Sequence, residues 1–200
     1  AYEIVINSNP CISYLMEENS ATMQALVIAH AAFGHNHFFK NNYLFKEWTD
    51  AEGIIDYLIF VRDYIRRCEE EYGPDTVEKV LDAAHSIMDY GIDRYKRPQK
   101  LNQKKEEERL KKLAEYAQTQ VNEIWNTLPA GVSASPIPKK EEDIFPAKPQ
   151  ENLLYFLEKY SPVLKPWERE ILRCIRKISQ YFYPQRQTKV MNEGFATFTH

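Results

Sequence analysis

Three of the five histidines lie within eight residues, at His30, His35 and His37. On a regular α-helix, residues five apart are separated by about 140° around the axis, so His30 and His35 would point in different directions. Gly34 lies where a single π-type turn could be inserted, and such a turn adds one residue to the helix. With that turn, the two imidazoles would become neighbours on one face. The spacing therefore predicts a pair of metal-ligating histidines, provided that the helix contains a π turn.

A carboxylate that could complete the site lies near the end of the chain, in Met191-Asn-Glu-Gly-Phe-Ala-Thr-Phe198. This run resembles the segment that supplies the glutamate ligand in gluzincin metallopeptidases, where Asn-Glu-Gly-Phe-Ala follows a helix bearing HExxH. The resemblance implies zinc, or another divalent transition metal, held by His30, His35 and Glu193 with one position open for water. Ala31 stands where HExxH has its general-base glutamate, so the general base is unassigned.

Other residues could assist the chemistry. Glu52-x-x-x-Asp56 imitates the glutamate–aspartate pair of such peptidases, which makes Glu52 an alternative third ligand and both residues candidate bases. An acidic pair directly after a helix N-cap also stabilises the helix dipole, which is the simpler explanation. His200 lies about 10.5 Å beyond Glu193 along a helix axis, so a proton donor or a partner of a ligand is favoured over direct coordination. The catalytic candidates are Glu52, Asp56 and His200.

The composition limits the classes of protein that fit. With 26 Lys and Arg against 29 Asp and Glu, and 44% apolar residues, the 200-residue chain can bury one substantial core and is not a general polyanion binder. The three cysteines are widely spaced and form no CxxC pair, which argues against disulfides or a thiolate zinc site and favours a reducing cytoplasm. No apolar run approaches the roughly 20 residues that span a bilayer. Phosphate-binding glycine motifs and the nucleophile elbow are absent.

Helical periodicity dominates the elements that must position these residues. A short strand is predicted at Tyr2–Ile6, ended by the turn-forming run 7–10. Helices are predicted at 22–39, 51–71, 75–90, 113–128, 151–159 and 167–183, and from about 190 onward. The predicted fold is mainly α, a multi-helix domain with one short N-terminal strand. The likeness to gluzincins would make it zincin-like.

Proline content divides the chain. Five of the eleven prolines fall within 129–149, which predicts a proline-rich connection between a helical region at 1–128 and a second at 150–200 that packs on the first. The chain opens on Ala1, and its last residues are typical of an unfinished amphipathic helix. We therefore expect a piece of a longer protein.

Longer runs distributed over the chain resemble the stage V sporulation protein R family. They are Glu3-Ile-Val-Ile-Asn-Ser-Asn-Pro10, His30-Ala-Ala-Phe-Gly-His-Asn36, Gly91-Ile-Asp-Arg-Tyr-Lys-Arg-Pro98, Pro149-Gln-Glu-Asn-Leu-Leu-Tyr155, Tyr181-Phe-Tyr-Pro-Gln-Arg-Gln-Thr188 and Met191-Asn-Glu-Gly194. The resemblance implies a role in sporulation, through formation of the spore cortex, a peptidoglycan layer, although relatives also occur in bacteria that make no spores. Together with the metal ligands, it suggests a zinc-dependent hydrolase-like protein acting on an amide of cell-wall or peptide type.

Two other functions remain open at this point. The chain could be a non-catalytic assembly or regulatory factor that docks a protein partner of the sporulation or stress programme. The basic run that begins at Arg94 and ends at Lys105 could instead contact nucleic acid, but the acidic run 106–108 follows at once and favours a solvated helix face.

Overall fold

The computed structural model describes residues 2–95, 97–98, 100–125 and 151–200. The predicted proline-rich connection at 129–149 lies outside these residues. The chain forms two compact units, one of residues 1–101 with 150–200 and the other of residues 102–149. The second unit contributes the helix α6, Gln103–Trp125. Within the described residues, no helix combines the length and the apolar character needed to cross a bilayer.

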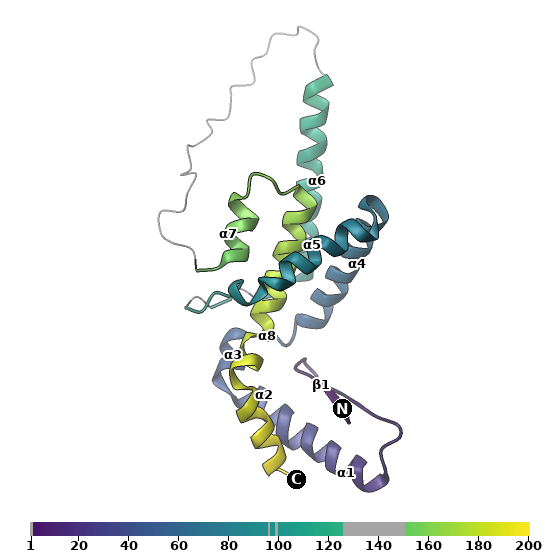
Figure 1. Cartoon of the computed structure of the whole chain (residues 1–200), viewed down its shortest axis with the longest axis vertical. Helices are drawn as coiled ribbons and strands as arrows, with labels where there is room; N and C mark the ends of the chain where they lie inside the picture. Colours follow the sequence, from purple (N-terminus) through teal and green to yellow (C-terminus); the bar gives the residue numbers. More distant parts are fainter. Residues whose placement is uncertain (1, 96, 99, 126–150) are drawn as a thin grey trace. The chain divides into compact units, whose positions relative to one another are not determined.

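The mainly helical fold predicted from periodicity is confirmed. In chain order, the first unit contains β1 (Glu3–Ile6), β2 (Ile12–Leu15), α1 (Ala21–Ala29), the π-helix η1 (His30–His35), α2 (Asn36–Asn41), α3 (Tyr43–Trp48), α4 (Ile54–Tyr72), α5 (Pro74–Ser86), the 3₁₀ turn η2 (Met88–Tyr90), α7 (Leu153–Tyr160) and α8 (Pro166–Phe198), which Figure 1 shows in sequence colours.

The predicted N-terminal strand is present, and it has a partner that periodicity did not reveal. Strands β1 and β2 pair antiparallel, with Glu3 opposite Leu15 and Val5 opposite Ser13. Because strand side chains alternate, Glu3 and Val5 share one face. Ile4 and its cross-strand neighbour Tyr14 lie on the other face and are exposed. The hairpin thus presents one carboxylate on its inward face.

Among the described residues of the first unit, a larger and a smaller apolar cluster stand out. The larger joins α4, α5, α7 and the first half of α8, and its buried members are Cys68, Val77, Ala84, Leu154, Trp167, Ile171, Leu172 and Ile175. The smaller is aromatic: Phe38, Phe39 and Phe45 pack together, with Val5 and Phe195 against them. The smaller cluster ties the hairpin, α2, α3 and the second half of α8 into one assembly.

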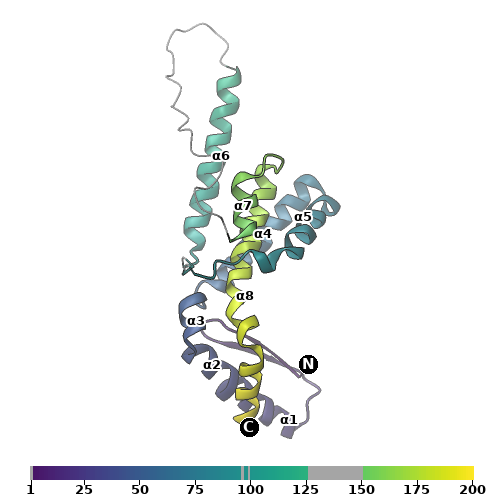
Figure 2. The same cartoon turned by 60° about the vertical axis from the view of Figure 1, so that its left-hand side comes forward.

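The prediction of separate helices at 167–183 and from about 190 is wrong, because α8 runs without a break through Pro184, as Figure 2 shows. An interior proline removes one helical hydrogen bond and normally favours a break. Here Pro184 is fully buried, and the Thr188 hydroxyl donates to its carbonyl at 2.7 Å. Tertiary packing along α8 therefore outweighs the local preference, and one helix reaches from the larger cluster to the histidines.

Candidate metal centre

The π turn that the pairing of His30 and His35 requires is present in the structure. Residues His30–His35 form a π-helix that continues α1 into α2. The extra residue in the turn brings the imidazoles of His30 and His35 together, with ring centroids 4.6 Å apart. His37 lies away from this pair, exposed, and its ring stacks on Phe195. The local backbone geometry thus selects two of the three clustered histidines.

Gly34 lets α8 approach the π turn closely. A Cβ atom added at Gly34 would lie 2.5 Å from Ala196 Cα and 2.6 Å from Ala196 Cβ. Ala196 is itself fully buried, so both sides of this contact use the smallest side chains. The close approach sets Asn192 and Glu193, one turn earlier on α8, beside the histidines.

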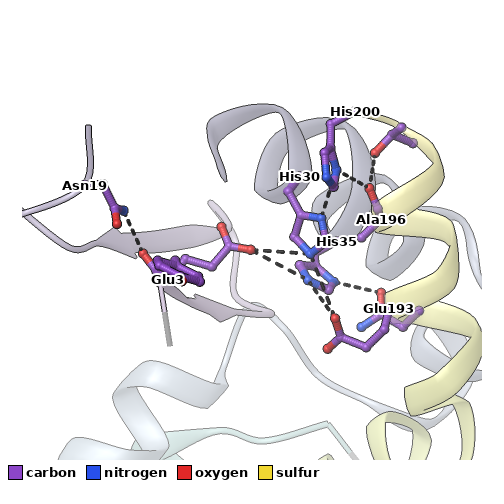
Figure 3. A network of polar contacts seen from close by, with 10 residues as sticks. Glu3, Asn19, His30, His35, Glu193, Ala196 and His200 are labelled. Carbon is purple, nitrogen blue, oxygen red and sulfur yellow. Dashed lines mark hydrogen bonds and ion pairs between the residues drawn. The ribbon is translucent and has the colours of Figure 1, made fainter. Parts of the chain in front are cut away.

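Two carboxylates face the Nε2 atoms of the histidine pair. Glu3 Oε1 lies 3.6 Å from His30 Nε2 and 3.9 Å from His35 Nε2, and Glu193 Oε2 lies 3.9 Å from each (Figure 3). The ligand atoms of Glu3, His30 and His35 all lie within 4.8 Å of one another. Two ligands bound to one tetrahedral zinc ion lie roughly 3.4 Å apart. Glu3, His30 and His35 would share an ion if the separations between their ligand atoms shortened by at most about 1.4 Å.

The Nδ1 atoms of His30 and His35 each contact a polar side chain of α8 or of the residues that follow it. His35 Nδ1 lies 3.0 Å from the side-chain oxygen of Asn192, and both residues are buried. Because an amide oxygen only accepts, Nδ1 donates to Asn192, which leaves Nε2 as the ring nitrogen that can bind a metal. His30 Nδ1 lies 3.2 Å from His200 Nδ1, which also contacts the Ala196 carbonyl at 3.1 Å. Such contacts fix the orientation of metal-ligating imidazoles.

The electrostatics of the cluster favour a cation. Burial raises the pKa of Glu3, the neighbouring Glu193 adds to this, and His35 and His200 oppose it. Burial, followed by His35 and His200, lowers the pKa of His30 and so favours the neutral imidazole that a metal requires. Glu3 Oε2 is buried and has no hydrogen-bond partner in the described part of the chain. A buried carboxylate without full compensation is costly, and a bound cation would compensate it. The residues present thus fit a divalent metal ion.

Comparisons with known proteins match the entire chain. The model of the family described as SpoVR like protein matches residues 1–200. The chain belongs to the SpoVR family. A curated relative, the uncharacterized protein YcgB of Escherichia coli (strain K12), is 62% identical over 200 residues. The match covers 100% of this chain but only 39% of that SpoVR-like relative, so the chain spans less than half of its length. No solved structure matches the chain.

Glu3 is the potential ligand of this candidate site that sequence reasoning missed. It lies 27 positions before His30, in a strand whose other residues are β-branched and apolar. The sequence did offer one indication: Glu3 lies two residues before the apolar Val5, so both share one face of the predicted strand. A charged residue on the inward face of a half-buried strand is unusual. That signal becomes informative only when the strand is known to pack against the histidines.

The remaining candidates lie in different places. Glu52 and Asp56 are exposed at the beginning of α4, and neither belongs to the group of Glu3, His30 and His35. The Asp50 carboxylate accepts from the Gly53 amide at 3.3 Å, one residue before α4 begins. His200 contacts the rear of the His30 ring, and Glu193 faces the Nε2 atoms of both histidines. The structure therefore gathers His30, His35, Glu193 and His200, with Glu3 added.

Proposed function

We propose that this SpoVR-family chain holds one divalent transition-metal ion, zinc by preference, and hydrolyses an amide of peptide or cell-wall type. The observation that carries the proposal is the convergence of two imidazole nitrogens and one carboxylate oxygen of the largely buried Glu3 within 4.8 Å. Imidazole and carboxylate ligands with an open position are typical of hydrolytic zinc sites. Amide hydrolysis would be consistent with the link to the spore cortex that the family resemblance implies.

The two carboxylates suit different roles in this proposal. The Glu3 side chain is only 13% exposed, whereas that of Glu193 is 56% exposed. A buried carboxylate without a hydrogen-bond partner is suited to be the third ligand, so we assign that role to Glu3. Glu193, which the gluzincin likeness suggested as a ligand, reaches the same centre from the solvent side. We assign Glu193 as the general base, the role left vacant by Ala31.

The reaction then follows ordinary metal-assisted hydrolysis. When bound, the ion would lower the pKa of a water molecule and polarise the amide carbonyl. The Glu193 carboxylate accepts a proton from water as the water oxygen bonds to the carbonyl carbon. The carbon–nitrogen bond breaks, and the proton passes to the leaving amine, so the products are an acid and an amine. Asn192 and His200 keep the rings of His35 and His30 in position.

Replacing Glu193 by glutamine tests its assignment as base. We expect Glu193→Gln to keep the zinc affinity within about threefold of wild type while lowering amide hydrolysis about a hundredfold or more, the usual contribution of a general base. Glu3→Gln should instead weaken zinc binding. Zinc is titrated calorimetrically into the full-length protein, and amine release from a set of N-acetyl dipeptides is followed by fluorescence. Unchanged hydrolysis in Glu193→Gln would remove this residue from the mechanism.

Replacing Asn192 by alanine tests the support of His35. We expect Asn192→Ala to weaken zinc binding by about 10- to 100-fold, because the ring loses the acceptor that fixes its orientation and its tautomer. Gln187→Ala removes an exposed amide from the same helix and serves as the matched control. Competition titration with a chelator of known affinity measures both variants. Equal affinities of the two variants would contradict the supporting role of Asn192.

A further inference from the structure

A cavity of about 440 Å³ lies between the hairpin and the helical segment that bears the histidines. Ligand pockets of proteins have volumes of roughly 300–1,000 Å³, so the space is large enough for a small molecule. Its described lining residues are Val5, Asn9, Pro10, Cys11, Ser13, Leu15, Ile28, Ala31, Ala32, Asn36 and Lys40. Neither the metal ligands nor the proposed base belong to this set.

The floor of the cavity is a row of helical residues four positions apart. Ile28, Ala32, Asn36 and Lys40 follow one another along α1, η1 and α2. The row begins apolar and ends in an ammonium group. A ligand lying along it would have its apolar part near Ala32 and a polar part near Lys40.

The cavity adjoins the proposed metal centre through two shared elements. On the hairpin, the lining residue Leu15 lies directly opposite Glu3 on the neighbouring strand. The lining residue Val5 follows Glu3 by two positions and lies on the same face of β1. On η1, the lining residue Ala31 directly follows His30. A molecule in the cavity therefore lies next to the groups that would hold the ion.

Charge and polarity indicate what kind of molecule fits. Among the described lining residues, Lys40 is the only one with a charged side chain, and it is half-buried. Its ammonium donates to the Ser8 carbonyl at 3.0 Å, which uses one of its three N–H groups. The apolar wall made by Val5, Leu15 and Ile28 suits an aliphatic group. An apolar body with one anionic end complements this lining.

We propose that the cavity binds the C-terminal residue of an amide substrate, with a small aliphatic side chain in the apolar part and the free carboxylate on Lys40. This inference rests on the proposed hydrolase function and specifies its substrate class. Because the cavity adjoins the proposed centre at Val5, Leu15 and Ala31, the scissile amide is the last peptide bond of the substrate.

The test uses two probes of the same shape, 4-methylpentanoate and its neutral amide. Each is titrated into the metal-free full-length protein, and binding is followed by NMR through the methyl signals of Ala31 and Ala32. We expect the carboxylate to bind about tenfold more tightly than the amide, since a charge-assisted hydrogen bond is stronger than a neutral one. Lys40→Met should abolish that preference, and Ala32→Leu should weaken both probes by filling the cavity.

Lys46→Met removes an exposed lysine from α3 and should leave the preference unchanged. Equal affinities of acid and amide in the wild type would overturn the proposal, as would a preference that survives Lys40→Met. The wild-type comparison needs no variant to fold. Because the titrations contain no metal, their outcome is independent of zinc binding and of turnover, so failure of this inference and failure of the hydrolase proposal are told apart.

Discussion

Replacing His35 by alanine should abolish stoichiometric zinc binding. His35 is buried, its Nε2 atom faces both carboxylates, and its Nδ1 atom is already held by Asn192. Binding free energies of structural zinc sites are roughly 10–16 kcal/mol over four ligands, so one ligand contributes about 3 kcal/mol, or more than a hundredfold in affinity. His30→Ala should have a similar effect.

The measurement is the metal content of the full-length protein, with competition titration of zinc for the affinity. His85→Ala is the matched control, because His85 is exposed near the end of α5 and belongs to no part of the cluster. We expect about one equivalent of metal in the wild type and in His85→Ala. Less than about a tenth of an equivalent in the wild type, unchanged by His35→Ala, would falsify the metal centre.

Replacing Gly34 by alanine should destabilise the protein by about 3 kcal/mol and weaken zinc binding with it. In an ordinary helix, glycine to alanine stabilises by about 1 kcal/mol, so the sign of the change depends on the surroundings. Here the new Cβ would lie 2.5 Å from the Cα of Ala196, and a backbone atom cannot rotate away. Relief requires α8 to move back from η1. That movement would carry Asn192 and Glu193 away from His35.

Gly194→Ala provides a control, because Gly194 lies on α8, the helix that packs against Gly34. A Cβ at Gly194 would meet nothing within 4 Å, so this variant should gain the ordinary helical stabilisation of up to about 1 kcal/mol. Urea unfolding followed by circular dichroism gives the free energy of unfolding of both variants. If Gly34→Ala proves as stable as Gly194→Ala, the close approach of α8 and η1 does not constrain the fold as argued.

Much of the local architecture follows from the sequence. The mainly helical fold and the N-terminal strand agree with hydrophobic periodicity, and the π turn agrees with the spacing of His30 and His35 around Gly34. Periodicity, caps and turn chemistry act over a few residues, so they can be recognised without a tertiary structure. The same reasoning failed at Pro184. An interior proline normally favours a helix break, but here the packing of the buried Pro184 outweighs that local preference.

Which residues make up the site depends on contacts between segments that are far apart in the sequence. The sequence by itself determined that two histidines share one face of a helix and that a glutamate in a gluzincin-like run was available. Only the tertiary structure decided that Glu3 faces these histidines, that Asn192 supports His35 and that His200 contacts His30. These partners lie 27, 157 and 170 residues apart in the chain. Their proximity depends on how a hairpin and α8 pack against η1, and packing is a property of complementary surfaces that no local pattern encodes.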